Sequence, residues 1–257
     1  DDLLRELCAI PGVSGEENLV CKYVSDKLSS FADVSVTQDN SVIATIGSEE
    51  ARKHILFDAH IDQIGLTVTH IDKHGFIKFG TCGGFDPRIL YGSTVNIHGT
   101  DELKGVICST PPHLSKGKEK TPDTDDMFID LGMDKNEIRN KISPGDRISL
   151  DSKFYELLNK NVASGATDDR SGVYTLIKLA EKLSSLDADM RFTILLSSRE
   201  EVGRMGAGTA AYKIMPDEAI AVDVSFVKQP GTTDDIHCEL DKGPMIGIAP
   251  SLSKKVY

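Results

Sequence analysis

A largely apolar run that leads into two adjacent glutamates is the feature that most restricts the fold of this chain. The run extends from Phe192 to Leu196, and Glu200 and Glu201 follow after three intervening residues. A short apolar run of this kind is typical of a strand that is buried on both faces. Two carboxylates at the end of a buried strand repel each other and lose hydration, which is costly unless a positive charge lies opposite them. The fold therefore has to supply a compensating group at this position.

Two other predicted strands end in a similar way. The run ILFDAHID ends with His60 and Asp62, and the run AIAVDV contains Asp223 near its end. A further acidic pair, Asp168 and Asp169, directly precedes a predicted helix. Ligands of open α/β sheets bind beyond the carboxyl ends of the strands. If these strands are parallel neighbours, we expect all of these side chains to converge on one rim of the sheet.

Each of these residues also has an explanation that requires no ligand. Asp168 or Asp169 would be a suitable helix N-cap, and Glu200 and Glu201 would complement the dipole of the helix that follows them. A single histidine at a strand end, such as His60, is more often structural than a metal ligand. The combination favours a metal site, because several carboxylates and a histidine on one dry rim require cations. Mixed oxygen and imidazole donors suit Zn²⁺, Co²⁺ or Mn²⁺.

The rest of the chain predicts an α/β domain that is interrupted by a β domain. Residues 191–224 read as a strand–helix–strand unit, which is most simply parallel and right-handed. Short alternating runs separated by glycines and turns predict a small barrel or sandwich in the middle of the chain. We expect a mixed, largely parallel sheet flanked by helices in residues 1–66 and 163–257, and an all-β, barrel-like insert in residues 67–162. Ser14 or Gly15 suits the N-cap of the second N-terminal helix.

Composition restricts the partners and the compartment. The formal net charge of −11 disfavours nucleic acid and anionic membranes as partners. No apolar run reaches the roughly 18 residues that a membrane-spanning helix requires. The five cysteines are odd in number and lack paired metal spacing, so we expect them to be small buried residues in a reducing cytoplasm.

Four short motifs and the opening segment occur together in a characteristic order. The motifs are HID (60–62), GATDDRSG (165–172), REEVGRMGA (199–207) and VDV (222–224), and the chain opens with LLRELCAIPGVSGEE. They resemble the motif set of the TET-type dinuclear metallo-aminopeptidases, the glutamyl or deblocking aminopeptidases, some of which carry the label cellulase or endoglucanase. The resemblance covers the whole chain. It implies a fold of the zinc-exopeptidase type and a cytoplasmic exopeptidase that acts on peptides with a free N-terminus. It also implies self-association through the β insert into dimers and then dodecamers.

The resemblance implies a role for each residue of the rim. One metal would be held by three ligands, namely His60, Asp168 and Asp223. Asp168 would bridge to a second metal, for which Glu201 would be a further ligand. Glu200 would be the general base, and Asp62 would orient the ligating imidazole. If the strand stays extended through both glutamates, their side chains point to opposite sides, which agrees with separate roles. The implied cofactors are two divalent ions per subunit, Zn²⁺ or Co²⁺, with Mn²⁺ as an alternative.

The chain departs from the family pattern in three places. Gln63 stands where the family usually has Glu, and Arg199 where it usually has Gln. The second metal of the family takes a histidine from a C-terminal His-Thr-Pro-like motif, which these 257 residues do not contain. Five histidines lie in no matching context and are expected on the surface or in loops: His70, His74, His98, His113 and His237. We expect the functional protein to continue for several tens of residues with a further histidine. A chain that ends at Tyr257 should hold one metal, be nearly inactive and aggregate.

Other activities are compatible with parts of this pattern. A related dinuclear metallo-carboxypeptidase or N-deacylase would fit the motif GATDDRSG, whereas REEVG and the β insert favour the aminopeptidase. A glycosidase would use two of the carboxylates and no metal, but it usually needs aromatic platforms for sugar rings. The chain has no Trp and 6% aromatic residues, which weighs against that activity. A non-catalytic assembly protein would have no need of Glu200. The sequence does not indicate which N-terminal residue is preferred.

Overall fold

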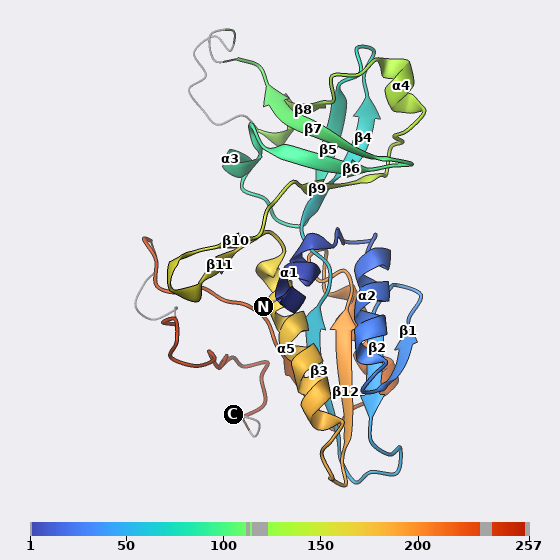
Figure 1. Ribbon diagram of the computed structural model, residues 1–257, viewed down its shortest axis with the longest axis vertical. Helices are drawn as coiled ribbons and strands as arrows, with labels where there is room; N and C mark the ends of the chain where they lie inside the picture. The colour runs from blue at the N-terminus through green and yellow to red at the C-terminus, as the bar shows by residue number, and fades with distance from the viewer. Residues whose placement is uncertain (1, 112–113, 115–122, 232–237, 255–257) are drawn as a thin grey trace.

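The protein has an α/β body and a separate β-barrel, which lies at the top of Figure 1. The structure is a computed structural model that describes residues 2–111, 114, 123–231 and 238–254. The chain begins in the α/β body, crosses into the barrel after the third strand of the body, and returns to build the rest of the α/β sheet (Figure 1). The expected fold class, an α/β fold interrupted by a barrel-like β insert, is therefore confirmed.

The sheet of the α/β body is mixed, as expected. Its five strands lie in the order β1-β2-β12-β3-β13. Their bounds are β1 (Asp33–Val36), β2 (Val42–Ile46), β12 (Arg191–Ser197), β3 (His54–His60) and β13 (Glu218–Ala221). Strands β1, β2 and β12 pair antiparallel, whereas β12 and β13 each pair parallel to β3. The carboxyl ends of β12, β3 and β13 consequently lie at the same edge of the sheet.

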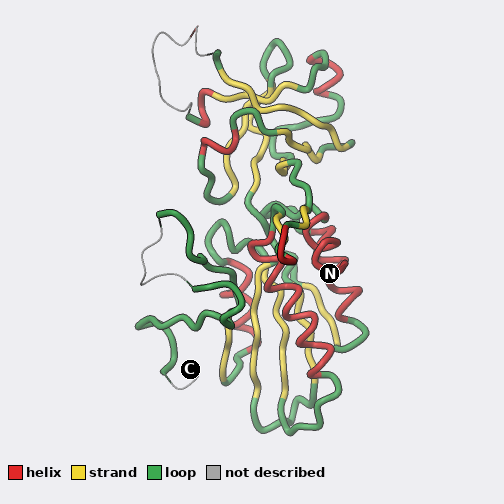
Figure 2. Tube along the Cα trace, turned by 60° about the vertical axis from the view of Figure 1, so that its left-hand side comes forward, coloured by secondary structure: helices red, strands yellow, loops and turns green. Residues whose placement is uncertain are grey.

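Helices cover both faces of this sheet. The helices α1 (Asp2–Ala9), α2 (Asn18–Leu28) and α5 (Thr167–Leu183) cover one face (Figures 1 and 2). Helix α6 (Met205–Ile214) packs against β12 in a smaller core formed by Leu56, Leu195 and Ala210. The stripe of α5 that faces the larger core consists of Val173, Leu176, Ile177 and Ala180. These positions are three or four residues apart, so the helical period places them on one side of α5.

Arg170 fastens the start of α5 to the N-terminal segment and to the chain after β3. Its side chain is fully buried, and its Nε donates to the carbonyl of Ile61 at 2.9 Å. Its Nη1 donates to the carbonyls of Leu7 and Ile10. Burial lowers the pKa of Arg170 to about 10, so the guanidinium remains charged at neutral pH. Because Ile61 lies between His60 and Asp62, this buried charge also fixes the backbone beside the predicted rim.

The barrel is closed by six strands in the order β4-β5-β8-β7-β6-β9. Their bounds are β4 (Gly65–Ile71), β5 (Ile77–Cys82), β6 (Thr94–His98), β7 (Glu102–Ser109), β8 (Met127–Asp130) and β9 (Arg147–Leu150). Short helices lie in the connections: α3 (Pro87–Leu90), η2 (Thr124–Asp126) and α4 (Lys135–Arg139). Between the barrel and α5 lies a hairpin of β10 (Tyr155–Glu156) and β11 (Val162–Ala163), with η3 (Leu158–Lys160) at its tip.

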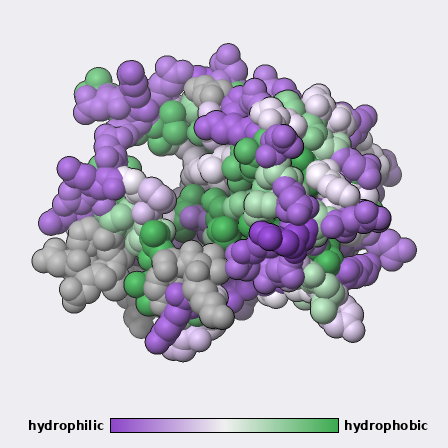
Figure 3. All heavy atoms as spheres, turned by 90° about the horizontal axis from the view of Figure 1, so that it is seen from below, coloured by the Kyte–Doolittle hydropathy of each residue, from purple (hydrophilic) through white to green (hydrophobic). Residues whose placement is uncertain are grey.

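After β13 the described residues form no further helix or strand, apart from an isolated bridge between Val227 and Cys238. Large apolar side chains are exposed in this segment, among them Phe226, Ile246 and Ile248. Figure 3, which views the molecule from below, shows apolar side chains around the opening between this segment and the α/β body. Within the described part of the chain, no helix is both long and apolar enough to cross a membrane.

Candidate metal and catalytic site

The shared edge of β3, β12 and β13 brings three of the predicted ligands together. His60 is the last residue of β3, and Asp223 follows two residues after β13. Asp168 reaches the same place from the start of α5, where its Oδ1 lies 3.0 Å from Nε2 of His60. One ligand atom from each of the three residues lies within 4.8 Å of the other two. Residues that are far apart in the sequence thus offer one nitrogen and two oxygens to one small volume.

Asp168 and Asp169, at the start of α5, occupy different positions. Asp168 and Asp169 have non-helical backbone angles, and the peptide bond between them is cis. Oδ1 of the buried Asp169 accepts a hydrogen bond from the backbone N–H of Gly172 at 3.0 Å, as an N-cap does. The side chain of Asp168 is 60% exposed and contacts His60 instead. Asp169 is therefore the helix cap, and Asp168 is the rim residue.

Asp62 is a fully buried carboxylate that receives several hydrogen bonds. Ser14 Oγ donates to its Oδ2 at 2.6 Å. The backbone N–H groups of Glu200 and Glu201 donate to Oδ1 at 2.9 Å and to Oδ2 at 3.2 Å. Nδ1 of His60 lies 3.1 Å from the Asp62 carbonyl oxygen and 3.4 Å from Oδ1, so both groups of Asp62 orient the imidazole. Burial would raise the pKa of Asp62, but its hydrogen bonds lower it, and the carboxylate is ionised at neutral pH.

The strand does not stay extended through both glutamates, so the condition for their side chains to point to opposite sides is not met. Strand β12 ends at Ser197, and Arg199 has a φ of 56°, in the left-handed region that interrupts a strand. The carbonyl of Glu200 accepts hydrogen bonds from the N–H groups of Gly203 and Arg204, both at 2.9 Å. Glu200 and Glu201 therefore lie in a turn before α6, which we call the glutamate turn (residues 199–204). The backbone N–H groups of both glutamates donate hydrogen bonds to the Asp62 carboxylate, which takes the place of the partner that a neighbouring strand would provide.

The carboxyl groups at and beside the rim outnumber the positive charges near them. Burial, followed by the charge of Asp168, raises the pKa of Glu201 to about 7. Burial also raises the pKa of Asp169 to about 8 and that of Asp58 to about 6. Oδ2 of Asp169 and Oδ1 of Asp58 are buried and have no hydrogen-bond partner among the described residues. Such a cluster is stable at neutral pH only if it gains protons or a cation.

His60 carries the positive charge that this cluster attracts. Burial lowers its pKa, but hydrogen bonds to Asp168 and Asp62 outweigh burial and raise the pKa to about 11. The proton on Nε2 therefore lies between the imidazole and a carboxylate. A divalent cation on the same two groups would replace that proton, and a donor set of one imidazole and two carboxylates suits Zn²⁺, Co²⁺ or Mn²⁺. The residues fit a metal, and Glu201 adds a further carboxylate beside Asp168.

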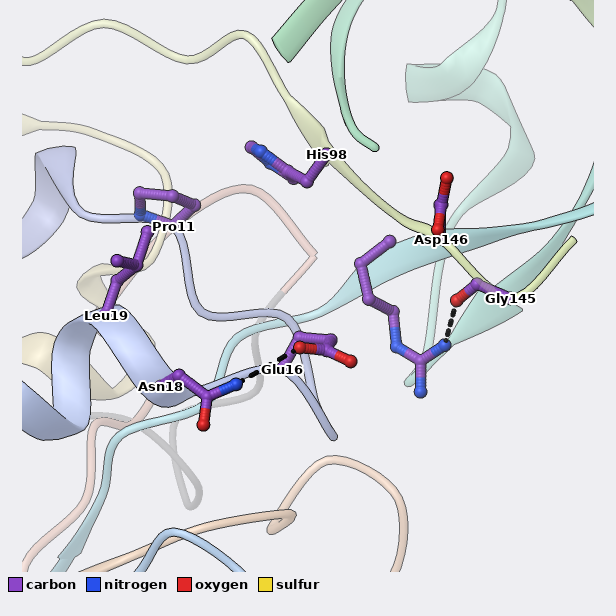
Figure 4. Close-up of a pocket in the computed structure, with 8 residues that line it drawn as sticks. Pro11, Glu16, Asn18, Leu19, His98, Gly145 and Asp146 are labelled. Atoms are coloured by element: carbon purple, nitrogen blue, oxygen red, sulfur yellow. Dashed lines mark hydrogen bonds between the residues drawn. The ribbon is translucent and has the colours of Figure 1, made fainter. Parts of the chain in front are cut away.

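A separate cavity of about 300 Å³ lies where the barrel meets the N-terminal loop. Figure 4 shows Glu16 and Asn18 of the α/β body on one side of it and His98, Gly145 and Asp146 of the barrel on the other. None of the rim residues lines this cavity, so the cavity and the candidate metal site are distinct.

Among the described residues, His60 is the only histidine in the group of possible metal ligands at the rim. His70 and His74 are exposed, as expected. His98 is half-buried in β6 rather than in a loop, where its Nε2 lies 2.9 Å from Ser149 Oγ. His113 and His237 lie outside the described residues.

Ser14 makes a contact beside the site that the sequence did not reveal. It was expected, with Gly15, as the N-cap of the second helix, but α2 begins at Asn18 and Glu17 occupies the cap position. The Ser14 hydroxyl contacts Asp62 instead, 48 residues away.

Comparisons with known proteins identify the family of this chain. Residues 40–256 match the family described as M42 glutamyl aminopeptidase. The lysyl aminopeptidase of Pyrococcus furiosus is 33% identical over 99% of this chain and 75% of its own length. The solved structure of an aminopeptidase from Desulfurococcus kamchatkensis has a TM-score of 0.87 and 32% identity, over 95% of this chain and 68% of that one.

A second solved structure is similar over nearly the same region. It is the TET1 peptidase of Pyrococcus horikoshii, described as assembling into a tetrahedron or a large octahedral shell, with a TM-score of 0.80 and 34% identity. The match covers 91% of this chain and 71% of that one. The family match spans most of the chain, and the similar proteins are aminopeptidases. This protein is therefore a peptide hydrolase of the aminopeptidase class and belongs to the M42 glutamyl aminopeptidase family.

Proposed function

We propose that the protein removes N-terminal residues from peptides with a metal-activated water, for which Glu200 is the general base. The observation that supports this proposal most directly is the convergence of His60, Asp168 and Asp223 beside the glutamate turn. His60, Asp168 and Asp223 would hold one divalent ion, and Asp168 would share a second with Glu201. When bound, Zn²⁺ or Co²⁺, or Mn²⁺ as an alternative, would lower the pKa of a water and polarise the scissile carbonyl.

Side chains of the protein would carry out the proton transfer and orient the metal ligand. Glu200 would accept the proton of the attacking water and pass it to the departing amine. Its Oε1 already accepts a hydrogen bond from Arg204 Nε at 3.1 Å, and its backbone N–H donates a hydrogen bond to Asp62 Oδ1. Asp62 would keep the imidazole of His60 oriented with Nε2 toward the metal. The side chain of Glu200 is 27% exposed, which allows it to meet a substrate that enters from solvent.

The excess of carboxylates at the rim also suits the positively charged N-terminus of a peptide. A free α-amino group would be attracted to these side chains, whereas an N-acetyl group carries no charge. We therefore expect the protein to release the first residue of a short peptide and to leave the N-acetylated form of the same peptide intact. Chromatography of the two digestions measures this directly. Cleavage of the acetylated peptide without action on the free one would favour an N-deacylase and contradict the proposal.

The proposal includes self-association through the barrel, with residues 1–66 and 163–257 as the catalytic domain and residues 67–162 as the assembly domain. The similarity to a shell-forming peptidase supports this role, and the rim residues all lie outside the insert. Dimers and then dodecamers are the proposed states. A reducing cytoplasmic location is proposed because all five cysteines are free.

Replacing Val106 should weaken this association. Val106 lies on β7 of the barrel and is 41% exposed. A charge in the middle of an apolar interface costs binding energy, so Val106→Glu is expected to give smaller particles in light scattering. Val36→Glu is the matched control, because Val36 is likewise exposed, at 50%, but lies on β1 of the α/β body. Unchanged particle size in Val106→Glu would remove this face of the barrel from the interface.

A further inference from the structure

We propose that Ser14 and Arg147 are positioning residues that connect the barrel to the glutamate turn through Asp62. Ser14 fixes the Asp62 carboxylate, and Arg147 of the barrel fixes Ser14. The inference deepens the proposed function, and its kinetic consequence rests on the role proposed there for Glu200. Its structural consequence, the protection of two backbone amides, can be measured whether or not that role is correct.

The first step is the dependence of Asp62 on Ser14. Asp62 has no exposed surface, so water cannot replace a hydrogen bond that it loses. Its Oδ2 has two donors, and the bond from Ser14 Oγ at 2.6 Å is shorter than the one from the Glu201 N–H at 3.2 Å. Without the hydroxyl, Oδ2 would keep only the longer bond. The carboxylate would then be held less firmly, and its hydrogen bonds with the two backbone amides of the glutamate turn would weaken.

The second step is the position of Ser14 itself. The Ser14 N–H donates to the carbonyl of Gln63 at 3.3 Å, and the Gln63 N–H donates to the carbonyl of Gly12 at 3.0 Å. This bridge places Ser14 directly beside Asp62 in the chain that enters the barrel. A Cβ on Gly65 would lie 2.5 Å from Val13 and 2.8 Å from the Ile148 carbonyl. The N-terminal loop, β4 and β9 are therefore in close contact, and only glycine fits at their junction.

The third step is the contact made by Arg147. This residue opens β9 and is paired with Thr67 of β4 at the base of the barrel. Its Nε donates to the carbonyl of Ser14 at 3.0 Å, and its Nη1 donates to Thr67 Oγ1 at 3.1 Å and to the Gly145 carbonyl at 2.8 Å. Arg147 therefore holds the loop and the barrel with one side chain. It also lines the cavity in Figure 4, so the connection is accessible from that side.

Amide hydrogen exchange tests the connection in the full chain. The N–H groups of Glu200 and Glu201 should be protected in the unaltered protein, because Asp62 accepts both. Loss of one hydrogen bond corresponds to roughly a tenfold change in local opening, so Ser14→Ala should raise the exchange rate of these two amides about tenfold. Ser109→Ala is the matched control: Ser109 is a buried serine of the barrel whose hydroxyl also makes one hydrogen bond. It should leave these amides unchanged.

A double-mutant cycle distinguishes a connected path from two separate effects. Arg147→Met alone should raise the same exchange rates about three- to tenfold, but it should add less than twofold once Ser14→Ala is present. Arg139→Met is the control, because Arg139 contacts a carbonyl within the barrel only. Independent, multiplicative effects of the two changes would overturn the inference, as would exchange rates in Ser14→Ala equal to those in Ser109→Ala.

The kinetic readout separates the inference from the proposed function. If Glu200 is the base, Ser14→Ala should lower kcat about tenfold with KM within twofold, because only the reacting geometry is disturbed. A merely destabilising change would reduce the amount of folded protein and leave kcat per folded molecule unchanged. Faster amide exchange with an unchanged kcat would support the connection and contradict the role of Glu200. Unchanged exchange would contradict the connection alone.

Discussion

Glu200→Gln is expected to lower kcat by about 10²–10⁴-fold while the metal content of the protein stays the same. The substitution removes the group that accepts a proton from the attacking water, but it preserves the size of the side chain. It should preserve the turn as well, because Asp62 holds the backbone N–H of residue 200 and not its side chain. The measurements are steady-state hydrolysis of a peptide with a free N-terminus and metal analysis of the same preparation.

The neighbouring glutamate provides the comparison for this result. Burial and the charge of Asp168 raise the pKa of Glu201, whereas the side chain of Glu200 accepts a hydrogen bond from Arg204. Glu201→Gln should therefore weaken metal binding, and activity should recover at high metal concentration. If Glu200→Gln lost metal and Glu201→Gln kept it, the two proposed roles would be reversed.

The convergence of the rim could be predicted from the sequence because it follows from strand polarity. A parallel arrangement of β3, β12 and β13 places their carboxyl ends together, whatever the loops do. His60 and Asp223 then reach the same edge by their positions relative to strand ends alone. The glycine-punctuated middle of the chain similarly indicated a small barrel or sandwich, and the structure shows a closed barrel.

The details that arrange the side chains could not be predicted from the same pattern. Propensity does not show that Arg199 adopts a positive φ, which turns the two glutamates out of the strand. Nor does it distinguish Asp169 as the helix cap from Asp168 as the rim residue, because both are good caps. The contact between Ser14 and Asp62 depends on how the N-terminal loop packs against the barrel entry, and that packing is tertiary.

Two of the three departures from the family pattern, Gln63 and Arg199, have a structural context. Gln63 contributes its backbone to the bridge with Val13, and this contact does not depend on the side chain. Arg199 opens the glutamate turn, and its Nε is buried without a partner among the described residues. Both positions therefore border the rim, and neither contributes a ligand atom to the group formed by His60, Asp168 and Asp223.

Asp168→Asn should abolish metal binding at the rim, and activity should fall with it. Asp168 is the carboxylate nearest to Nε2 of His60, and the proposed second ion depends on it too. An amide oxygen is neutral, so the substitution removes a negative charge from both proposed metal positions. Metal ions contribute several kcal/mol to transition-state stabilisation in hydrolytic sites, which corresponds to roughly a 10³-fold loss of rate. Removal of metal with a chelator should have the same effect on the unaltered protein, and Zn²⁺ or Co²⁺ should reverse it.

Asp169→Asn is the matched control for this prediction, one residue further along the chain. Asparagine caps helices as well as aspartate does, so the hydrogen bond with the Gly172 N–H should persist. Burial raises the pKa of Asp169 to about 8, so without metal its carboxyl group is largely protonated at neutral pH, and asparagine resembles that form. Elemental analysis after dialysis should therefore find metal in Asp169→Asn and none in Asp168→Asn. Equal metal content in the two variants would show that the ion is held without Asp168, and the proposed ligand set would be wrong.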